Sequence, residues 1–274
     1  MNLVVTPQRF ADSHLPTGVR LRYVEQGDTT GHAVILLHGY TDSSFSFSRV
    51  LPLLDASRHV YALDLRGHGD SERPSGGYEL REFADDVIAF MDESGLESAT
   101  LVGHCMGSLV AQRIALVAPR RVTRLVLISS MTAARRMEGI FELQRAIEAF
   151  DGLVPAEFAR DFQTGTVYRP VPVGFMEGVI AESLKVPPGI WRATLQGLLA
   201  DDHTSRLCRI RTPTLLIWGE QDALLRRAEQ EALASALANA VLRVYPETGH
   251  SPHWERPERF VRDLEAFIAR SATK

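Results

Sequence analysis

Short apolar segments alternate with helical patterns along most of this chain, and this alternation limits the possible folds more than any other feature. The predicted strands are residues 19–25, 33–37, 60–65, 99–102, 125–128, 214–218 and 241–245. The clearest helices are residues 78–95 and 259–270, where apolar side chains recur at helical spacing. Strands that alternate with helices of this length predict an α/β fold with a mostly parallel sheet and helices on both faces.

The alternation stops between residues 131 and 208. Met137, Ile140, Phe141 and Ile147 have helical spacing there, but prolines interrupt the segment repeatedly and no strand is evident. We therefore expect one α/β core formed by residues 1–130 and 209–274. A helical cap formed by residues 131–208 would be inserted at a strand end, in position to act as a lid.

Composition excludes several classes of protein. Of the 274 residues, 45% are hydrophobic, 34 are acidic and 30 are basic. This is the balance of a globular chain without a nucleic-acid-binding surface. Apolar stretches reach only about eight residues where a membrane helix needs ~20. No signal peptide is evident, so we expect a cytoplasmic protein without a membrane partner. Two cysteines are too few for a disulfide framework, and the oligomeric state stays open.

The segment 99–111 carries the strongest chemical signal. A predicted strand runs into Gly103-His104-Cys105-Met106-Gly107, and a helix follows. This is the form of the G-x-S-x-G nucleophile turn, with sulfur in place of the serine oxygen. Such a turn needs small residues two positions to either side, and it directs its central side chain out of the sheet at a helix N-terminus, where a thiolate is favoured. A small buried cysteine is the alternative interpretation.

Two more residues complete a catalytic pattern. Asp222 follows the predicted strand 214–218, and His250 follows the strand 241–245. The order nucleophile, acid, histidine is typical of one architecture, and three strands deliver the three residues to one edge of the sheet. At this point the chain resembles the α/β-hydrolase superfamily, specifically its capped esterase-like members. The resemblance covers residues 19–268, apart from the details of the insertion.

The resemblance implies roles for further residues. Leu37-His38-Gly39-Tyr40 is similar to the oxyanion loop of the superfamily, so the backbone N–H groups of Tyr40 and Met106 are the expected oxyanion donors. The turn at residues 64–71, D-x-R-G-x-G-x-S, is expected to be architectural. Dehalogenases and epoxide hydrolases of the superfamily need an aspartate at the position of Cys105 and are excluded. No dinucleotide or metal motif accompanies these residues, so we expect no cofactor and no metal.

Five other groups of residues are weaker candidates. Asp42 and Glu220 are alternative carboxylates to Asp222, and His253 is expected to be a helix-cap or surface residue rather than a pocket residue. The run at residues 201–203, Asp-Asp-His, fits a solvated helix end better than a metal site. Most aromatic side chains of the insertion are expected in its core, and some should face the substrate. For Cys208 the sequence offers only a packed or exposed position.

The predicted activity is cofactor-free hydrolysis of an ester, thioester or lactone in a small-molecule acyl substrate. Cys105, His250 and Asp222 would form the triad, with a covalent acyl-enzyme. Two explanations for the sulfur stay open: a natural thiol, as in the dienelactone hydrolases of the superfamily, or replacement of an original serine. An acyltransferase that uses the same intermediate and a non-catalytic receptor of the same fold are the alternative functions.

Overall fold

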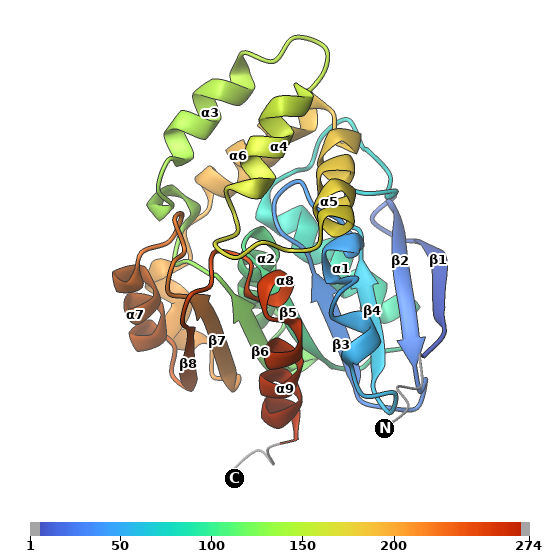
Figure 1. The fold of residues 1–274 in the computed structure, drawn as a ribbon. Coiled ribbons are helices and arrows are strands. Elements are labelled where there is room, and N and C mark those ends of the chain that lie inside the picture. Colours follow the sequence, from blue (N-terminus) through green and yellow to red (C-terminus); the bar gives the residue numbers. More distant parts are fainter. Residues whose placement is uncertain (1–5, 270–274) are drawn as a thin grey trace.

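The computed structural model describes residues 6–269, and within them one mixed sheet forms the centre of the molecule (Figure 1). Its strand order is β1-β2-β4-β3-β5-β6-β7-β8. Strand β2 runs antiparallel to β1 and β4, and the remaining neighbours are parallel. The strands are β1 Gln8–His14, β2 Arg20–Gly27, β3 Ala33–Leu37, β4 His59–Leu63, β5 Ala99–His104, β6 Val122–Ile128, β7 Thr214–Gly219 and β8 Ala240–Tyr245.

Nine α-helices lie within the part of the chain that the structure describes. They are α1 Leu80–Glu93, α2 Met106–Val117, α3 Ile140–Glu148, α4 Ala156–Thr164, α5 Val173–Lys185, α6 Pro188–Ala200, α7 Arg227–Ala236, α8 Pro252–Glu255 and α9 Pro257–Ile268. No helix among residues 6–269 has the length and apolar character needed to cross a bilayer. The predicted α/β architecture, a mostly parallel sheet with helices on both faces, is confirmed.

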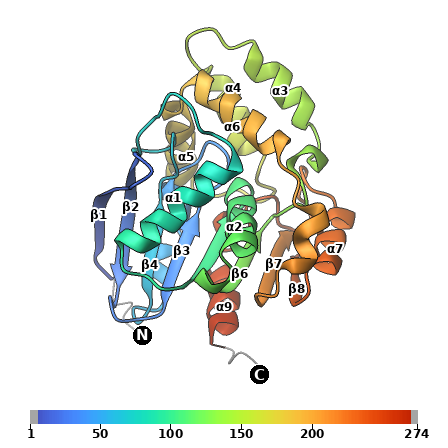
Figure 2. The same cartoon turned by 180° about the vertical axis from the view of Figure 1, so that it is seen from behind.

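The two faces of the sheet are covered by different helices because side chains alternate along each strand. In β3, Ile35 and Leu37 pack in the core that contains α1 and α2, which lie in front of the sheet in Figure 2. Val34 and Leu36 point the other way and pack with α9. Burying both faces explains why the central strands are continuously apolar.

All seven predicted strands are present, and their ends differ by a few residues at most. Helix α1 follows from the predicted pattern, and it stops before Gly95, whose φ of +66° suits glycine. The predicted C-terminal helix extended to residue 270, which lies outside the described residues. Strand β1 was not predicted, because it is an exposed edge strand in which Phe10 and Ala11 are the only apolar residues. Backbone pairing with β2, such as Phe10 opposite Val24, forms this strand without an apolar face.

Between β6 and β7 the chain forms α3, α4, α5 and α6, and no strand is found there within the described residues. These helices gather at one end of the sheet in Figure 1. Hydrogen bonds connect these helices to the α/β core. The Tyr40 hydroxyl donates to the Trp191 carbonyl at 2.7 Å. The His250 backbone N–H donates to the Thr166 carbonyl at 2.8 Å. The helical segment therefore contacts the same loops that hold the candidate site.

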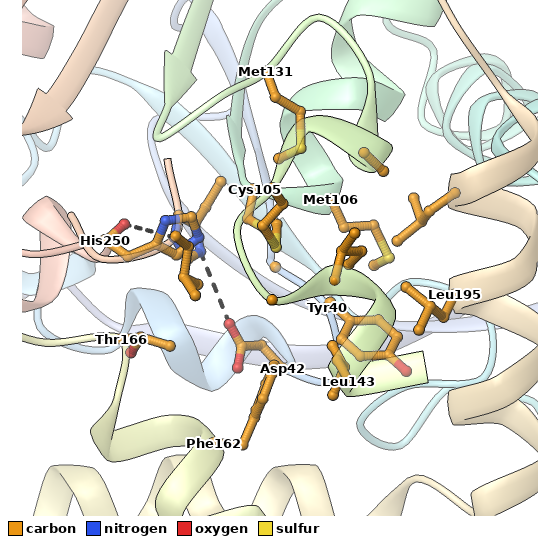
Figure 3. Close-up of a pocket in the computed structure, with 18 of the residues that line it drawn as sticks. Tyr40, Asp42, Cys105, Met106, Met131, Leu143, Phe162, Thr166, Leu195 and His250 are labelled. Atoms are coloured by element: carbon orange, nitrogen blue, oxygen red, sulfur yellow. Dashed lines mark hydrogen bonds and ion pairs between the residues drawn. The ribbon is translucent and has the colours of Figure 1, made fainter. Parts of the chain in front are cut away.

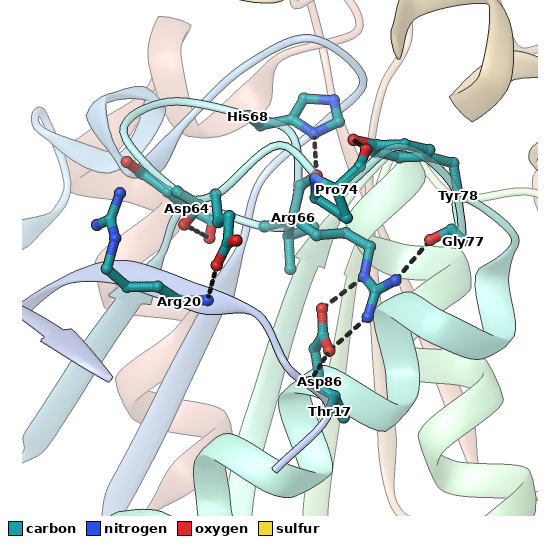
Figure 4. Close-up of polar contacts among 12 residues, drawn as sticks. Thr17, Arg20, Asp64, Arg66, His68, Pro74, Gly77, Tyr78 and Asp86 are labelled. Carbon is teal, nitrogen blue, oxygen red and sulfur yellow. Dashed lines mark hydrogen bonds and ion pairs between the residues drawn. The ribbon is translucent and has the colours of Figure 1, made fainter. Parts of the chain in front are cut away.

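The turn after β4 is held by buried polar contacts (Figure 4). Asp64 accepts backbone N–H groups from Ser44 at 2.7 Å and Asp70 at 2.9 Å. Arg66 makes a two-pronged contact with Asp86, at 2.6 Å for each pair of atoms. None of these side chains lines the cavity described below. These contacts agree with the architectural role that was predicted for this turn.

Replacing Arg66 with methionine is expected to lower the free energy of unfolding by about 3–5 kcal/mol, because it leaves the buried Asp86 carboxylate without its charge partner. The side chains of Arg66 and Asp86 are 6% and 1% exposed. Denaturant unfolding monitored by circular dichroism measures the change. The control is Arg160→Met, since Arg160 pairs with Glu177 and both side chains are about half exposed. That variant should lose less than about 1 kcal/mol, and equal losses in the two variants would contradict the account.

Candidate active site

Cys105 occupies the turn between β5 and α2 in a strained backbone conformation, with φ of 47° and ψ of −109°. A side chain rarely adopts this region, and such strain persists only where the surroundings enforce it. The neighbours are crowded: a Cβ on Gly103 would lie 2.3 Å from the Gly107 carbonyl oxygen, and one on Gly107 would lie 2.3 Å from the Leu37 carbonyl oxygen. Only glycine fits at either position, as the sequence spacing predicted.

Asp222 and His250 meet at the ends of β7 and β8. The His250 Nδ1–H donates to Asp222 Oδ2 at 2.9 Å, and both side chains are buried. The other carboxylate oxygen of Asp222 accepts the backbone N–H groups of Leu224 and Leu225 at 2.9 and 3.0 Å. These bonds fix the carboxylate, which in turn fixes the tautomer of the imidazole. Within residues 6–269 the buried Nε2 of His250 has no well-formed hydrogen bond, and the group that interacts with it is the thiol of Cys105.

The charges around His250 favour its protonated form. Burial opposes the imidazolium, but the Asp222 carboxylate and the adjacent Cys105 outweigh it and raise the His250 pKa well above its usual value. Asp222 contributes both through its charge and through its hydrogen bond. The site is therefore suited to an imidazole that takes up a proton from the sulfur and then donates it to a leaving group.

Tyr40 and Met106 provide two backbone N–H groups beside Cys105. Neither N–H donates to a protein acceptor among residues 6–269. The loop that carries Tyr40 is held by His38, whose Nδ1–H donates to the Gly39 carbonyl at 2.8 Å while its Nε2 accepts the Leu65 N–H at 2.9 Å. Burial lowers the pKa of His38 to about 4, which keeps the ring neutral for both bonds. Two free donors at a helix N-terminus suit a developing oxyanion.

A cavity of about 170 Å³ opens at Cys105 (Figure 3). Apolar side chains form most of its wall, among them Met106, Leu109, Met131, Leu143, Phe162 and Leu195. The helical segment supplies part of this wall, through Leu143 of α3, Phe162 of α4 and Leu195 of α6. Asp42 and Gln163 bring polar groups into it. The sequence predicted that some aromatic residues of the insertion face the substrate, and Phe162 lines this cavity.

The weaker candidates take other positions. Glu220 is exposed, and Asp42 lines the cavity without contacting His250 Nδ1, which bonds Asp222. The prediction for His253 is wrong: this residue is fully buried in α8, with its ring centroid 4.6 Å from that of His104. Pro252 starts α8 directly after the His250 loop, and this short helix turns His253 into the core.

The remaining predictions have mixed outcomes. Asp201 is paired with Arg113 at 3.1 Å at the end of α6, but the adjacent His203 is buried rather than solvated. No group of three potential metal ligands occurs within the described residues. Cys208 is exposed. Among the aromatic residues expected in the core of the insertion, Phe141 and Tyr168 are 55% and 57% exposed.

Comparison with known proteins decides the family. The model of a family described as "Alpha/beta hydrolase family" matches residues 34–263, which include the nucleophile turn, Asp222 and His250. The chain belongs to the alpha/beta hydrolase family. The superfamily resemblance found in the sequence is thereby confirmed, as is the prediction of an enzyme of this superfamily.

Individual relatives of this alpha/beta hydrolase differ in their named activities. The dihydrolipoyllysine-residue acetyltransferase component of the acetoin cleaving system of Cupriavidus necator is 30% identical over 92% of this chain, which spans 66% of that relative's length. The non-heme chloroperoxidase of Streptomyces lividans is 30% identical, covering 92% of this chain and 96% of the relative. An esterase from Exiguobacterium antarcticum superposes with a TM-score of 0.86 at 19% identity, covering 96% of this chain and all of that one.

Proposed function

We propose that this alpha/beta hydrolase cleaves a carboxylic ester-type bond, in an ester, a thioester or a lactone, by forming an acyl-enzyme on Cys105. One observation carries the proposal: Cys105 and His250 line the same apolar cavity, and Asp222 holds His250 through a 2.9 Å hydrogen bond. The free N–H groups of Tyr40 and Met106 support it further. Membership of a hydrolase family supports the reaction class.

The first half-reaction forms the acyl-enzyme. His250 accepts the proton of the Cys105 thiol, and the sulfur attacks the substrate carbonyl carbon. The carbonyl electron pair moves to oxygen, and the resulting oxyanion accepts hydrogen bonds from the N–H groups of Tyr40 and Met106. When the tetrahedral intermediate collapses, the bond to the leaving group breaks and His250 donates its proton to that group. A thioester on Cys105 remains.

The second half-reaction hydrolyses the thioester. His250 removes a proton from a water molecule as its oxygen attacks the thioester carbon. The same two N–H groups stabilise the second oxyanion, and the Cys105 thiolate leaves. The proton on His250 then returns to the sulfur, which restores the starting state. Asp222 holds the imidazole and stabilises its positive charge in both halves.

We propose residues 131–208 as a cap and residues 1–130 and 209–274 as the catalytic core. The cap helices supply part of the cavity wall and bond the loops of Tyr40 and His250 directly. A lid in this position would exclude water while the thioester forms. Acyl selectivity is therefore expected to depend on cap residues such as Leu143 and Leu195.

The Cys105→Ser variant separates the two explanations for the sulfur. If the thiol is the natural nucleophile, a serine oxygen is expected to lower kcat/KM for p-nitrophenyl butyrate by tenfold or more, because an alcohol is a weaker nucleophile and a poorer leaving group than a thiol. Steady-state release of p-nitrophenol at pH 8 measures this. A variant that is far more active than the parent would contradict the natural-thiol explanation and indicate that cysteine replaced an original serine.

Acyl transfer is the second candidate function. It is favoured by the acetyltransferase component that shares 30% identity with this chain, since both reactions pass through an acyl-enzyme. A competing alcohol or amine added during turnover distinguishes the two reactions. Hydrolysis predicts free acid as the main product at every acceptor concentration. A transferase predicts that the ester or amide of the acceptor becomes the main product while total turnover rises.

A further inference from the structure

Two hydrogen-bond acceptors face each other in the cavity beside Cys105. His104 Nδ1 lies 3.9 Å from Asp42 Oδ2, a distance too long for a hydrogen bond, and Figure 3 marks this contact with the dashed line that ends at Asp42. The two side chains are 3% and 4% exposed, and both residues line the cavity. The triad and the oxyanion donors use neither group.

The chemistry of His104 makes its Nδ1 an acceptor. Its Nε2 lies 3.1 Å from the His250 carbonyl oxygen, and because a carbonyl only accepts, Nε2 carries the hydrogen. Burial, together with the nearby imidazoles of His253 and His250, lowers the His104 pKa well below its usual value, so the ring is neutral. Nδ1 therefore presents a lone pair, and within residues 6–269 it has no hydrogen-bond partner.

Asp42 is fixed by the cap. Its Oδ1 accepts a hydrogen bond from Gln163 Nε2 at 2.9 Å, and the same nitrogen donates to Ser183 at 2.6 Å. Oδ2 is left facing His104. Burial raises the Asp42 pKa to about 7, opposed by the Gln163 bond, by the charge of His250 and by the nearby Gly39 amide. A carboxylate in such a site gains most from an added hydrogen-bond donor.

Gly39 of the oxyanion loop packs closely against this pair. A Cβ on Gly39 would lie 2.8 Å from His104 Nδ1 and 3.0 Å from Asp42 Oδ2, so only glycine fits beside the two acceptors. An apolar wall surrounds the pair. Buried polar atoms are normally hydrogen-bonded, and an unpaired one in an otherwise apolar pocket is a recognition group when a substrate supplies its partner.

We propose that Asp42 and His104 form a specificity site that binds a hydroxyl group of the substrate, close to the ester carbonyl, with the hydroxyl donating its single hydrogen to Asp42 Oδ2 or to His104 Nδ1. The substrate class is thereby narrowed to hydroxy esters, with the hydroxyl in either the acyl or the alcohol portion. This inference rests on the proposed ester hydrolysis at Cys105. Asp42 and His104 determine which ester is accepted and take no part in bond making or breaking.

Matched esters test the site, because replacing a methyl by a hydroxyl changes hydrogen bonding but hardly changes size. Methyl 3-hydroxybutyrate is compared with methyl 3-methylbutyrate for the acyl side, and 2-hydroxyethyl butyrate with propyl butyrate for the alcohol side. The parent enzyme at pH 8 is expected to prefer the hydroxyl ester of at least one pair by about tenfold or more in kcat/KM. A preference for the methyl ester in both pairs overturns the inference.

The Asp42→Asn variant removes one acceptor from the site. Because the asparagine oxygen must accept from Gln163, its NH₂ group takes the position of Oδ2 and can no longer accept a hydrogen bond from a substrate hydroxyl. The hydroxyl-to-methyl ratio of kcat/KM is expected to fall about tenfold. Because both esters are assayed on the same preparation, this ratio does not depend on the fraction of the protein that is folded. The charge-matched control, Asp161→Asn, alters an exposed residue of α4 that does not line the cavity and should keep the parent ratio.

Binding to the Cys105→Ala variant separates this inference from the proposed function, because binding needs no turnover. Calorimetry with the same four esters should show tighter binding of the preferred hydroxyl ester. If the parent hydrolyses the esters but neither turnover nor binding favours a hydroxyl, the specificity site is disproved and the hydrolase stands. Suppose instead that the hydroxyl ester binds more tightly, but the parent neither hydrolyses any of the four esters nor becomes acylated by one. The specificity site then stands and the proposed hydrolysis is disproved.

Discussion

Replacing Cys105 with alanine is expected to lower kcat/KM for p-nitrophenyl butyrate by a factor on the order of 10⁴ to 10⁶. Without the sulfur no acyl-enzyme forms, and only the oxyanion donors and the binding cavity remain to accelerate attack by water. The variant should stay folded, since alanine carries a Cβ as cysteine does and therefore adds no strain to the backbone at φ of 47°. Initial rates of p-nitrophenol release, with circular dichroism as a check of folding, measure the effect.

The second cysteine supplies the matched control. Cys208 is exposed and does not line the cavity, so Cys208→Ala should keep the parent rate within about twofold. Iodoacetamide should inactivate the parent and the Cys208→Ala variant at the same rate. Loss of activity in Cys208→Ala, or substantial activity in Cys105→Ala, would contradict the assignment of the nucleophile.

Replacing Asp222 with asparagine is the second change with a large expected effect. We expect a loss of kcat/KM of about 10³–10⁴, because the amide no longer fixes the tautomer of His250 or stabilises its charge. The carboxylate is also the largest source of the raised His250 pKa. Since His250 acts as a base only when it is neutral, a lower His250 pKa should move the acid limb of the pH–rate profile to lower pH. Profiles of kcat/KM from pH 5 to 10 measure both effects.

Glu220 offers a carboxylate of the same loop for comparison. It is exposed and does not line the cavity, so Glu220→Gln should keep both the rate and the acid limb of the parent. An unchanged acid limb in Asp222→Asn, together with a shifted one in Glu220→Gln, would assign the acid to Glu220 instead.

The sequence predicted the core of this fold well because its central strands are buried on both faces. Strand β3 was predicted with both of its ends correct, from five consecutive apolar residues that all prove to be buried. Strand β1 could not be found in this way. Its residues are mostly exposed, and it forms through backbone hydrogen bonds with β2, which leave no hydrophobic pattern in the sequence.

The residues of the proposed site also differ in whether the sequence alone could predict them. Cys105, Asp222 and His250 could be selected because each follows a recognisable strand, and the motif spacing fixes their order. The role of Asp42 could not be anticipated, since it depends on Gln163, which lies 121 residues further along the chain. The position of His253 was predicted wrongly for the same reason. Its burial depends on packing against His104 and Phe47, and no local pattern records that packing.

Mass spectrometry of the intact protein during turnover tests the central claim most directly. The parent is mixed with p-nitrophenyl butyrate, quenched in acid at successive times and digested to locate any adduct. The account predicts one butyryl group on the peptide that contains Cys105, which accumulates and then decays as butyric acid appears. Hydrolysis without an adduct, or with an adduct on another residue, would contradict it. Absence of any acylation together with tight binding of a small ligand would indicate a receptor.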